Sequence, residues 1–183
     1  ELQRILESAG LDITLTSVAD YPGAPEVEET ENTFEGNALL KARALAEFTG
    51  LPAIADDSGI CIDALDGRPG ILSARWSGAI DDVDRANLEL VLDQTRDVAD
   101  DQRGAQFVCA AAFVDPAGTE FTVRGTLEGH ILRAPQGTNG FGYDPIFVPN
   151  GYDITTAQMT AEQKDSISHR GQALKKLVAT LPD

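Results

Sequence analysis

The sequence predicts a mixed α/β domain, and three observations support this fold class. Segments with strand-like alternation and segments with helical spacing follow one another through the first half of the chain. An antiparallel hairpin occupies the second half, which is typical of a mixed sheet rather than a purely parallel one. The 183 residues, 42% of them hydrophobic, suffice for one domain with a substantial core, and they also allow two lobes within it.

The first third of the chain predicts a helix, a strand, a loop and a second helix. Residues 1–10 carry apolar side chains at helical spacing, and Gly10 would end this helix; the apolar residues are Leu2, Ile5, Leu6 and Ala9. Residues 11–18 alternate apolar and polar side chains as a strand does, and the acidic residues 21–34 predict a long loop. Residues 32–49 have one apolar face and are followed by Gly50 and Pro52, so they predict a helix that ends there.

The middle of the chain predicts two short strands and a third helix. The strands, residues 52–56 and 59–65, would flank an Asp-Asp-Ser-Gly turn. A Gly/Pro-rich loop at residues 66–78 follows, with too many apolar residues for a linker. Residues 81–98 predict a helix whose acidic first turn suits the positive end of the helix dipole.

The last third of the chain predicts a hairpin, a loop and a broken helix. The hairpin covers residues 105–132, turns at Asp115-Pro116-Ala117-Gly118 and has a further strand-like segment after Gly125. Residues 134–152 form a glycine-rich loop. Residues 160–181 are expected to be helical with an interruption near Ser168.

Charge and cysteine content narrow the function classes. Fourteen Lys and Arg against 30 Asp and Glu give a formal net charge of −16, which argues against a general surface for nucleic acid or anionic membranes. A phosphorylated substrate would therefore need bound cations. Cys61 and Cys109 lie in apolar stretches without metal-ligand spacing, so reduced, buried thiols are expected. With no signal peptide and no long apolar run, the expectation is a cytoplasmic protein.

Three segments carry more polar and charged residues than a hydrophobic core requires. Asp56 and Asp57 must be solvated, paired or bound to a cation, and a polar turn that caps a strand is an equal alternative. The loop 137–144 lacks the lysine of a P-loop and could be only a turn, but it holds two aromatic rings between glycines, which would make a stacking platform. Near the end, three residues form a cationic cluster in an acidic chain, although each could equally be solvated or structural: Lys164, His169 and Arg170.

Taken together, these segments resemble a known family. The sequences "TFEGNALLKA", "ADDSG", "GRPGILSARWSG", "GTNGFGYDPIF" and "SISHRGQAL" occur in the order and spacing of the inosine/xanthosine triphosphate pyrophosphatases, the Ham1-like or RdgB-like enzymes. The resemblance spans nearly the whole chain. It implies a single ITPase-like domain over residues 1–183, a two-lobed mixed sheet with flanking helices and a central nucleotide cleft. It also implies a Mg²⁺-dependent homodimer that hydrolyses non-standard purine nucleoside triphosphates (ITP, dITP and XTP) to the monophosphate and pyrophosphate.

The resemblance also implies roles for individual residues. Asp57 would be the proton acceptor and metal ligand, Asp56 its acidic neighbour, and Ser58 a phosphate or sugar contact. Lys164 would neutralise the phosphates, and His169 and Arg170 would contact the base. The remaining nucleotide-binding positions lie together in the glycine-rich loop: Phe141, Gly142, Tyr143 and Asp144.

Two departures from the family pattern leave alternatives open. The family opens with a strand and a phosphate-binding Thr/Ser-x-Asn-x-x-Lys loop, so we expect the native polypeptide to begin before Glu1. Before Asn37 the family commonly has a metal-binding glutamate where this chain has Gly36, and water or Glu35 would have to substitute. The alternatives to the enzyme are a nucleotide-binding protein that has lost turnover and a Maf-like pyrimidine triphosphate pyrophosphatase.

Overall fold

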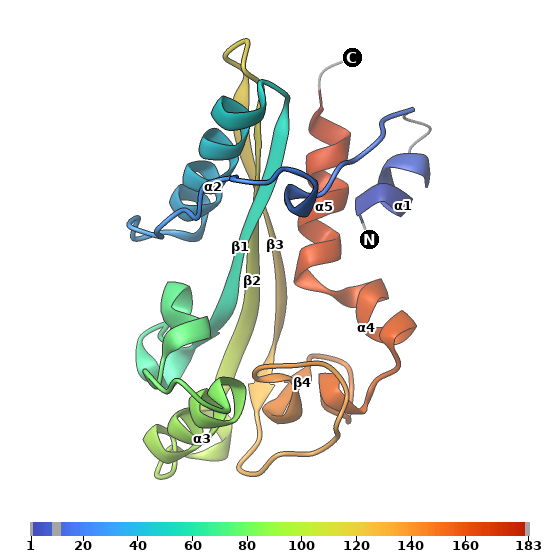
Figure 1. The fold of residues 1–183 in the computed structure, drawn as a ribbon. Helices are drawn as coiled ribbons and strands as arrows, with labels where there is room; N and C mark the ends of the chain where they lie inside the picture. The colour runs from blue at the N-terminus through green and yellow to red at the C-terminus, as the bar shows by residue number, and fades with distance from the viewer. Residues whose placement is uncertain (1, 9–11, 182–183) are drawn as a thin grey trace. The chain divides into compact units, whose positions relative to one another are not determined.

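The computed structural model describes residues 2–8 and 12–181, which form two compact units (Figure 1). Unit 1 comprises Glu1–Asp57, Cys109–Gly125 and His169–Asp183, and unit 2 comprises Ser58–Val108 and Thr126–Ser168. Strands β1 (Ala53–Ile62), β2 (Gly104–Val114) and β3 (Glu120–Ile131) each contribute residues to both units. With β4 (Phe147–Pro149) they form a four-stranded sheet in the order β1-β2-β3-β4.

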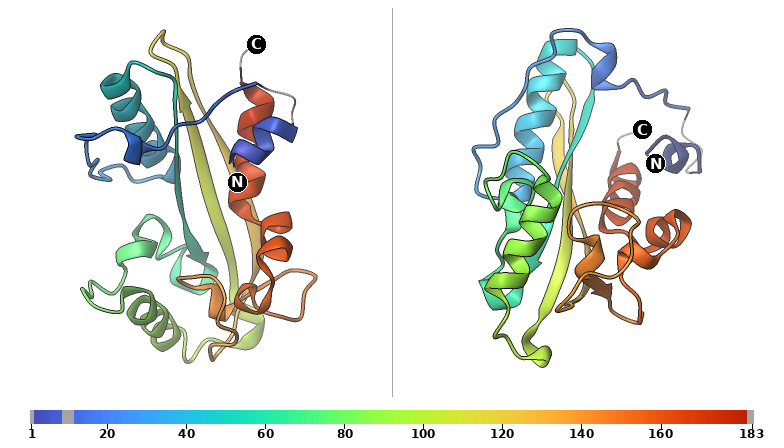
Figure 2. Two further views of the ribbon diagram at one scale, coloured as in Figure 1. Left: turned by 45° about the vertical axis from the view of Figure 1, so that its right-hand side comes forward. Right: turned by 60° about the horizontal axis from the view of Figure 1, so that its bottom comes forward.

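Unit 1 packs its two longer helices on opposite sides of the strands (Figure 2). Helix α2 (Phe34–Thr49) begins at Thr33, whose side chain accepts a hydrogen bond from the Gly36 amide, and ends at Gly50 in a left-handed conformation. Helix α5 (His169–Thr180) buries its apolar side against β2 in a cluster of Cys109, Ala111, Phe113, Ala173, Leu174 and Leu177. The short helix α1 (Leu2–Ser8) contributes Leu2 and Ile5 to the edge of this cluster.

Unit 2 has its own hydrophobic core. Helix α3 (Val83–Gln94) packs Leu88 and Val91 into a cluster with Ile60, Phe107 and Phe147. Strand β4 pairs antiparallel with β3, so that Ile131 lies opposite Phe147. Helix α4 (Ala161–Ile167) completes the unit, and its N-cap Thr160 forms a capping box with Gln163.

Most of the predicted elements are confirmed. The helices expected in 32–49 and 81–98 are α2 and α3, and the helical end of the chain is broken at Ser168 between α4 and α5. The hairpin turns where predicted, with the Gly118 amide bonded to the Asp115 carbonyl. Neither thiol is in a disulfide, and Cys109 is buried whereas Cys61 is partly exposed. The expected helix stop at Gly10 lies outside the described residues, as does the last predicted apolar residue of that helix, Ala9.

Two predicted breaks in strands are wrong. Asp56-Asp57-Ser58-Gly59 is not a turn but the middle of the continuous strand β1, where Gly59 is buried. Likewise, β3 runs straight through Gly125. A side chain at Gly125 would strike the backbone of His169 and Ala173, so this glycine permits close packing against α5 rather than a chain reversal.

Two further predictions about strands are wrong. Described residues 12–17 form no strand, because their backbone is bonded to a helix side chain: Gln3 donates to the Ile13 carbonyl and accepts from the Leu15 amide. In the glycine-rich loop, a strand was missed, since Phe147–Pro149 pairs with β3 as β4. Within the described residues, no helix has the length and apolar character required to cross a membrane.

Candidate active site

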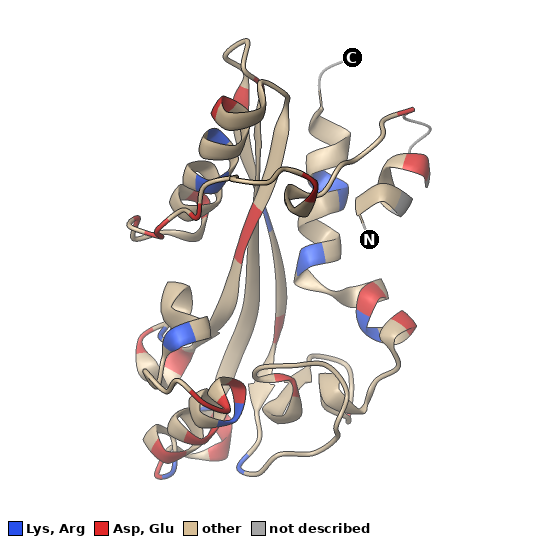
Figure 3. Ribbon diagram, viewed as in Figure 1, with Lys and Arg blue, Asp and Glu red and all other residues tan. Residues whose placement is uncertain are grey.

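Asp56 and Asp57 lie next to each other on β1 and face opposite sides of the sheet, as consecutive strand residues must. They interrupt an otherwise uncharged strand, with basic residues on α2 and α5 flanking it (Figure 3). Asp57 is 7% exposed, whereas Asp56 is partly exposed. The two carboxylates therefore have different surroundings and different partners.

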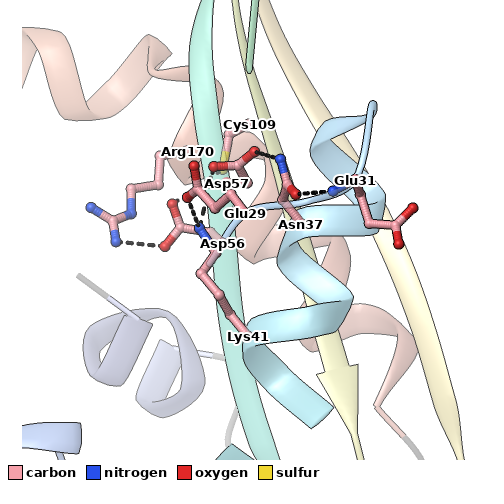
Figure 4. Close-up of polar contacts among 8 residues, drawn as sticks. All are labelled: Glu29, Glu31, Asn37, Lys41, Asp56, Asp57, Cys109 and Arg170. Carbon is pink, nitrogen blue, oxygen red and sulfur yellow. Dashed lines mark hydrogen bonds and ion pairs between the residues drawn. The ribbon is translucent and has the colours of Figure 1, made fainter. Parts of the chain in front are cut away.

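Asp57 is held by two side chains of α2 (Figure 4). The Asn37 amide donates to Oδ2 of Asp57 at 3.3 Å, and Nζ of Lys41 donates to Oδ1 at 3.2 Å. Asn37 and Lys41 are four residues apart, so they lie on one face of the helix. The fully buried Asn37 also accepts a hydrogen bond from the Glu31 amide at 3.0 Å, which ties the preceding loop to the site.

Lys41 also donates to Oε1 of Glu29 at 3.0 Å, so its ammonium bridges two carboxylates. Burial alone would lower the pKa of Lys41, but the hydrogen bond to Glu29 and the charge of Asp57 raise it on balance. For Asp57 the balance is different. Burial raises its pKa, Lys41 lowers it, the charge of Glu29 raises it again, and the net effect is a pKa above the usual value.

Asp56 pairs with α5 and β2 on the other side of the sheet. Nη2 of Arg170 donates to Oδ1 of Asp56 at 2.7 Å, and the Cys109 thiol donates to Oδ2 at 3.8 Å. Arg170 follows His169 at the start of α5, and its side chain is 54% exposed. Asp56 thus anchors a guanidinium group that still presents donors to the solvent.

Neither Glu35 nor position 36 places a second carboxylate beside Asp57. Glu35 receives two hydrogen bonds from Arg124 on β3, at 2.7 and 3.1 Å. At Gly36 an added Cβ would lie 2.7 Å from Cβ of Glu31, so the stem of Glu31 fills the space that a side chain would need. The Glu31 carboxylate points away from Asp57 (Figure 4).

In unit 2, the loop before β4 is organised around Asp144, which is 2% exposed. Its carboxylate accepts hydrogen bonds from the Phe141 amide, the Thr156 hydroxyl and the Lys164 ammonium. Gly140 is required beside it, because any Cβ there would collide with Oδ2 of Asp144. Asp144 is therefore fully engaged in holding the loop and Lys164.

The two aromatic residues of this loop have different environments. Phe141 is 75% exposed, and Nζ of Lys164 lies 5.1 Å from its ring centroid, a cation–π contact. Tyr143 is buried, and its hydroxyl donates to the Ser73 carbonyl at 2.7 Å. The platform predicted for both rings is thus limited to Phe141. Between them, the Gly142 amide donates to Asp84 of α3 at 2.9 Å.

The structure brings together some of the predicted residues and divides others. Unit 1 holds Asp56, Asp57, His169 and Arg170, whereas unit 2 holds Ser58, the loop residues 141–144 and Lys164. The expected cationic cluster is divided, since Lys164 pairs with Asp144 and Arg170 pairs with Asp56. Sequence reasoning missed Asn37, Lys41 and Glu29. The first two had a usable signal, because they are polar residues at i, i+4 spacing in a helix with an apolar face.

An apolar groove of about 590 Å³ in unit 1 is a separate feature. Its walls include Leu6, Leu45 and Phe113, and Asp115 is the one carboxylate among its lining residues. This largely apolar lining differs from the charged side chains that surround Asp56 and Asp57 on β1.

The class of protein is defined by solved structures that share this mixed α/β fold. The crystal structure of a nucleoside-triphosphatase / dITP/XTP pyrophosphatase from Mycobacterium abscessus matches with a TM-score of 0.82 and 52% identity, over 99% of this chain and 91% of that one. The Staphylococcus aureus Ham1 protein matches with a TM-score of 0.88 and 40% identity, over 97% of this chain and 88% of that one.

The sequence comparisons identify the family. The Ham1 family profile matches residues 1–180. A dITP/XTP pyrophosphatase from Streptomyces coelicolor is 57% identical over 178 residues, which cover 97% of this chain and 88% of that relative. The chain belongs to the Ham1 family.

Proposed function

We propose that this protein is an enzyme that hydrolyses non-standard purine nucleoside triphosphates (dITP, ITP and XTP) to the monophosphate and pyrophosphate, and so removes them from the nucleotide pool. The observation that carries the proposal is Asp57, a buried carboxylate that Asn37 and Lys41 hold in place at the motif shared with the family. Proteins named dITP/XTP pyrophosphatases are 52–57% identical to this chain over nearly its full length, which supports the substrate class.

Mg²⁺ is the proposed cofactor, and the donor set of unit 1 fits it. Carboxylate oxygens are its preferred protein ligands, and Mg²⁺ usually takes only one or two of them, with water and substrate phosphates completing the shell. Asp57 would hold the ion. When bound, the ion would offset the triphosphate charge and lower the pKa of water.

The proposed chemical step is the attack of water on the α-phosphorus. Asp57 accepts the proton of this water, a bond forms between the water oxygen and the phosphorus, and the bond to the α,β-bridging oxygen breaks as pyrophosphate leaves. Asn37 fixes the orientation of the Asp57 carboxylate through Oδ2. The exposed Phe141 ring and the Lys164 ammonium above it suit a base and a phosphate, respectively.

Base choice is proposed to depend on Arg170. A guanidinium group only donates hydrogen bonds, and O6 of hypoxanthine or xanthine only accepts them, whereas adenine presents an amino group there. Where the bound base shields this donor from water, a donor that faces another donor costs about 1–3 kcal/mol, which is enough to disfavour adenine. The ion pair with Asp56 would already restrict the Arg170 side chain, so that less conformational entropy is lost when the base binds.

We also propose a cytoplasmic homodimer. The assembly is what the resemblance to the family implies. The two thiols that form no disulfide suit a reducing compartment.

The test is the release of pyrophosphate from dITP, ITP and XTP with Mg²⁺, compared with ATP, dUTP and dTTP. Rapid turnover of the first three alone would support the proposal. Binding of dITP without turnover would favour a nucleotide-binding protein, and a preference for dUTP or dTTP would favour the Maf-like alternative.

A further inference from the structure

The glycine-rich loop before β4 is well supported on the side that faces the following segment of unit 2. The Phe141 amide donates to Oδ2 of the buried Asp144 at 3.0 Å, and Thr156 and Lys164 donate to the same carboxylate. The Lys164 ammonium also contacts the Phe141 ring. These contacts hold one side of the loop, and its other side faces α3.

A hollow of about 460 Å³ lies between this other side of the loop and α3. Asp84 and Leu88 line it from the helix, and Phe141, Gly142 and Pro145 line it from the segment before β4. Side-chain packing therefore gives the loop little support across this space. The Asp84 carboxylate spans it, because Oδ2 accepts a hydrogen bond from the Gly142 amide at 2.9 Å.

The surroundings of Gly142 make this hydrogen bond important for the shape of the loop. Gly142 has no side chain and a left-handed backbone with φ +58°, so its position depends on what its backbone contacts. Burial and, to a smaller extent, the charge of Asp84 raise the pKa of the Tyr143 phenol, which places the carboxylate close to the next residue as well. Asp84 lies in the first turn of α3, where the helix dipole favours a negative charge.

We propose that Asp84 is a positioning residue for the nucleotide base: by holding the Gly142 amide, it fixes the direction in which the preceding Phe141 ring is presented. The inference rests on the proposed function for the role of Phe141 as the surface on which the base stacks. This ring is 75% exposed, so its direction depends largely on the backbone that carries it. A rotation of the backbone at Gly142 would move the ring relative to Lys164, and base and ring would no longer align.

The first test is steady-state hydrolysis of dITP. Asp84→Ala should raise KM about three- to tenfold and keep kcat within about twofold of the parent, because a misplaced ring loses part of the roughly 5- to 150-fold in affinity that a base–aromatic stack supplies. Asp84→Asn keeps an oxygen that can accept from Gly142, so its KM should stay within about twofold of the parent. Asp81→Ala is the matched control, with the same truncation and charge change at an exposed residue just before α3, and it should leave KM unchanged.

A double-mutant cycle separates this role from a general effect on stability. In a Phe141→Ala background, Asp84→Ala should raise KM by less than about twofold, because the ring through which Asp84 acts is gone. A second measurement needs no substrate. Asp84→Ala should speed hydrogen exchange of the Gly142 amide, followed by nuclear magnetic resonance, on the order of tenfold, whereas Asp81→Ala should not.

Each outcome decides for or against the inference. An unchanged KM in Asp84→Ala, a fall in kcat alone, or equal changes in Asp84→Ala and Asp81→Ala would overturn it. An equal effect of Asp84→Ala with and without the Phe141 ring would also overturn it, as would an Asp84→Asn variant as impaired as Asp84→Ala. A parent that does not hydrolyse dITP would refute the proposed function instead. The exchange of the Gly142 amide would then decide whether Asp84 holds the loop, with an unchanged rate in Asp84→Ala as the refuting result.

Discussion

Tyr143→Phe tests whether Tyr143 supports the loop before β4 or contacts the proposed nucleotide substrate. The Tyr143 ring is 5% exposed in the core of unit 2, and its hydroxyl donates to the Ser73 carbonyl at 2.7 Å. Burial, with the charge of Asp84, raises the pKa of this phenol above its usual value, so it stays protonated and serves only as a hydrogen-bond partner. Removing the oxygen should therefore affect stability much more than catalysis.

The expected loss is small because the Ser73 carbonyl keeps a second donor. The buried Asn87 amide also donates to it, at 3.2 Å, so the substitution removes one hydrogen bond without leaving an orphan acceptor. The free energy of unfolding should fall by about 0.5–1.5 kcal/mol. For a chain of this size each kcal/mol shifts Tm by about 2–4 °C. Asn87→Leu should cost more, because it removes hydrogen bonds to Ser73 and Ala74 and leaves the Ser77 amide without its acceptor.

The assay is urea unfolding followed by circular dichroism, together with kcat/KM for dITP on the same preparations. Tyr143→Phe should be folded, slightly less stable and close to the parent in kcat/KM. A loss of more than about tenfold in kcat/KM, about 1.4 kcal/mol of transition-state stabilisation, with unchanged stability would refute the reasoning. It would mean that the hydroxyl leaves Ser73 to contact the substrate.

Three further predictions concern unit 1. Asp57→Asn should abolish pyrophosphate release while the thermal unfolding transition is retained, because the amide matches the carboxylate in size but is a poor base; near-normal rates at saturating Mg²⁺ would contradict this. Burial alone raises the pKa of Glu35, but the hydrogen bonds from Arg124 lower it on balance. The ion pair therefore stabilises the protein at a pH above the pKa of Glu35 in the unfolded chain, and this stabilisation is lost as the pH falls through the pKa in the folded protein. Arg124→Gln should then lower the free energy of urea unfolding by at most about 1 kcal/mol at pH 7. It should cost nothing at an acid pH where Glu35 is protonated in the folded protein, and an equal cost at both pH values would exclude the ion pair as its source. Gly36→Ala should destabilise the protein by about 1–3 kcal/mol, since its methyl group would displace the stem of Glu31, and unchanged urea unfolding would show that the loop yields freely.

Elements with local signals could be predicted from the sequence. Helix α2 has its N-cap and its terminal glycine in the sequence itself, and the hairpin turn has Pro116 and Gly118. The strand errors came from the same local signals. Gly59 and Gly125 look like breaks, but both lie inside continuous strands, and Gly125 permits close contact with α5, whose residues lie far along the chain. Residues 12–17 alternate like a strand, yet no neighbouring strand pairs with them among the described residues.

Within the candidate site, the two aspartates could be predicted from the sequence, but the side chains that bond to them could not. The pair Asp56 and Asp57 stood out because acidic residues are rare within an apolar run. Their hydrogen-bond partners come from 16 to 114 residues away, from Lys41 on Asp57 to Arg170 on Asp56, and no local pattern encodes such distances. The acidic loop before α2 offered several glutamates of equal appearance, and only the folded chain distinguishes Glu29 from its neighbours.

Because Asp56 and Asp57 face opposite sides of the sheet, the length of β1 before them is constrained. Each residue removed between Ala53 and Asp56 rotates the following side chains to the opposite face, so one deletion would present Asp57 to Arg170 and turn Ser58 toward Lys41. Two deletions would restore the facing but shift the carboxylate along the sheet by about 6.6 Å, beyond the reach of Asn37. Length variation should therefore be confined to the segment before Ala53, where Gly50 already ends the helix.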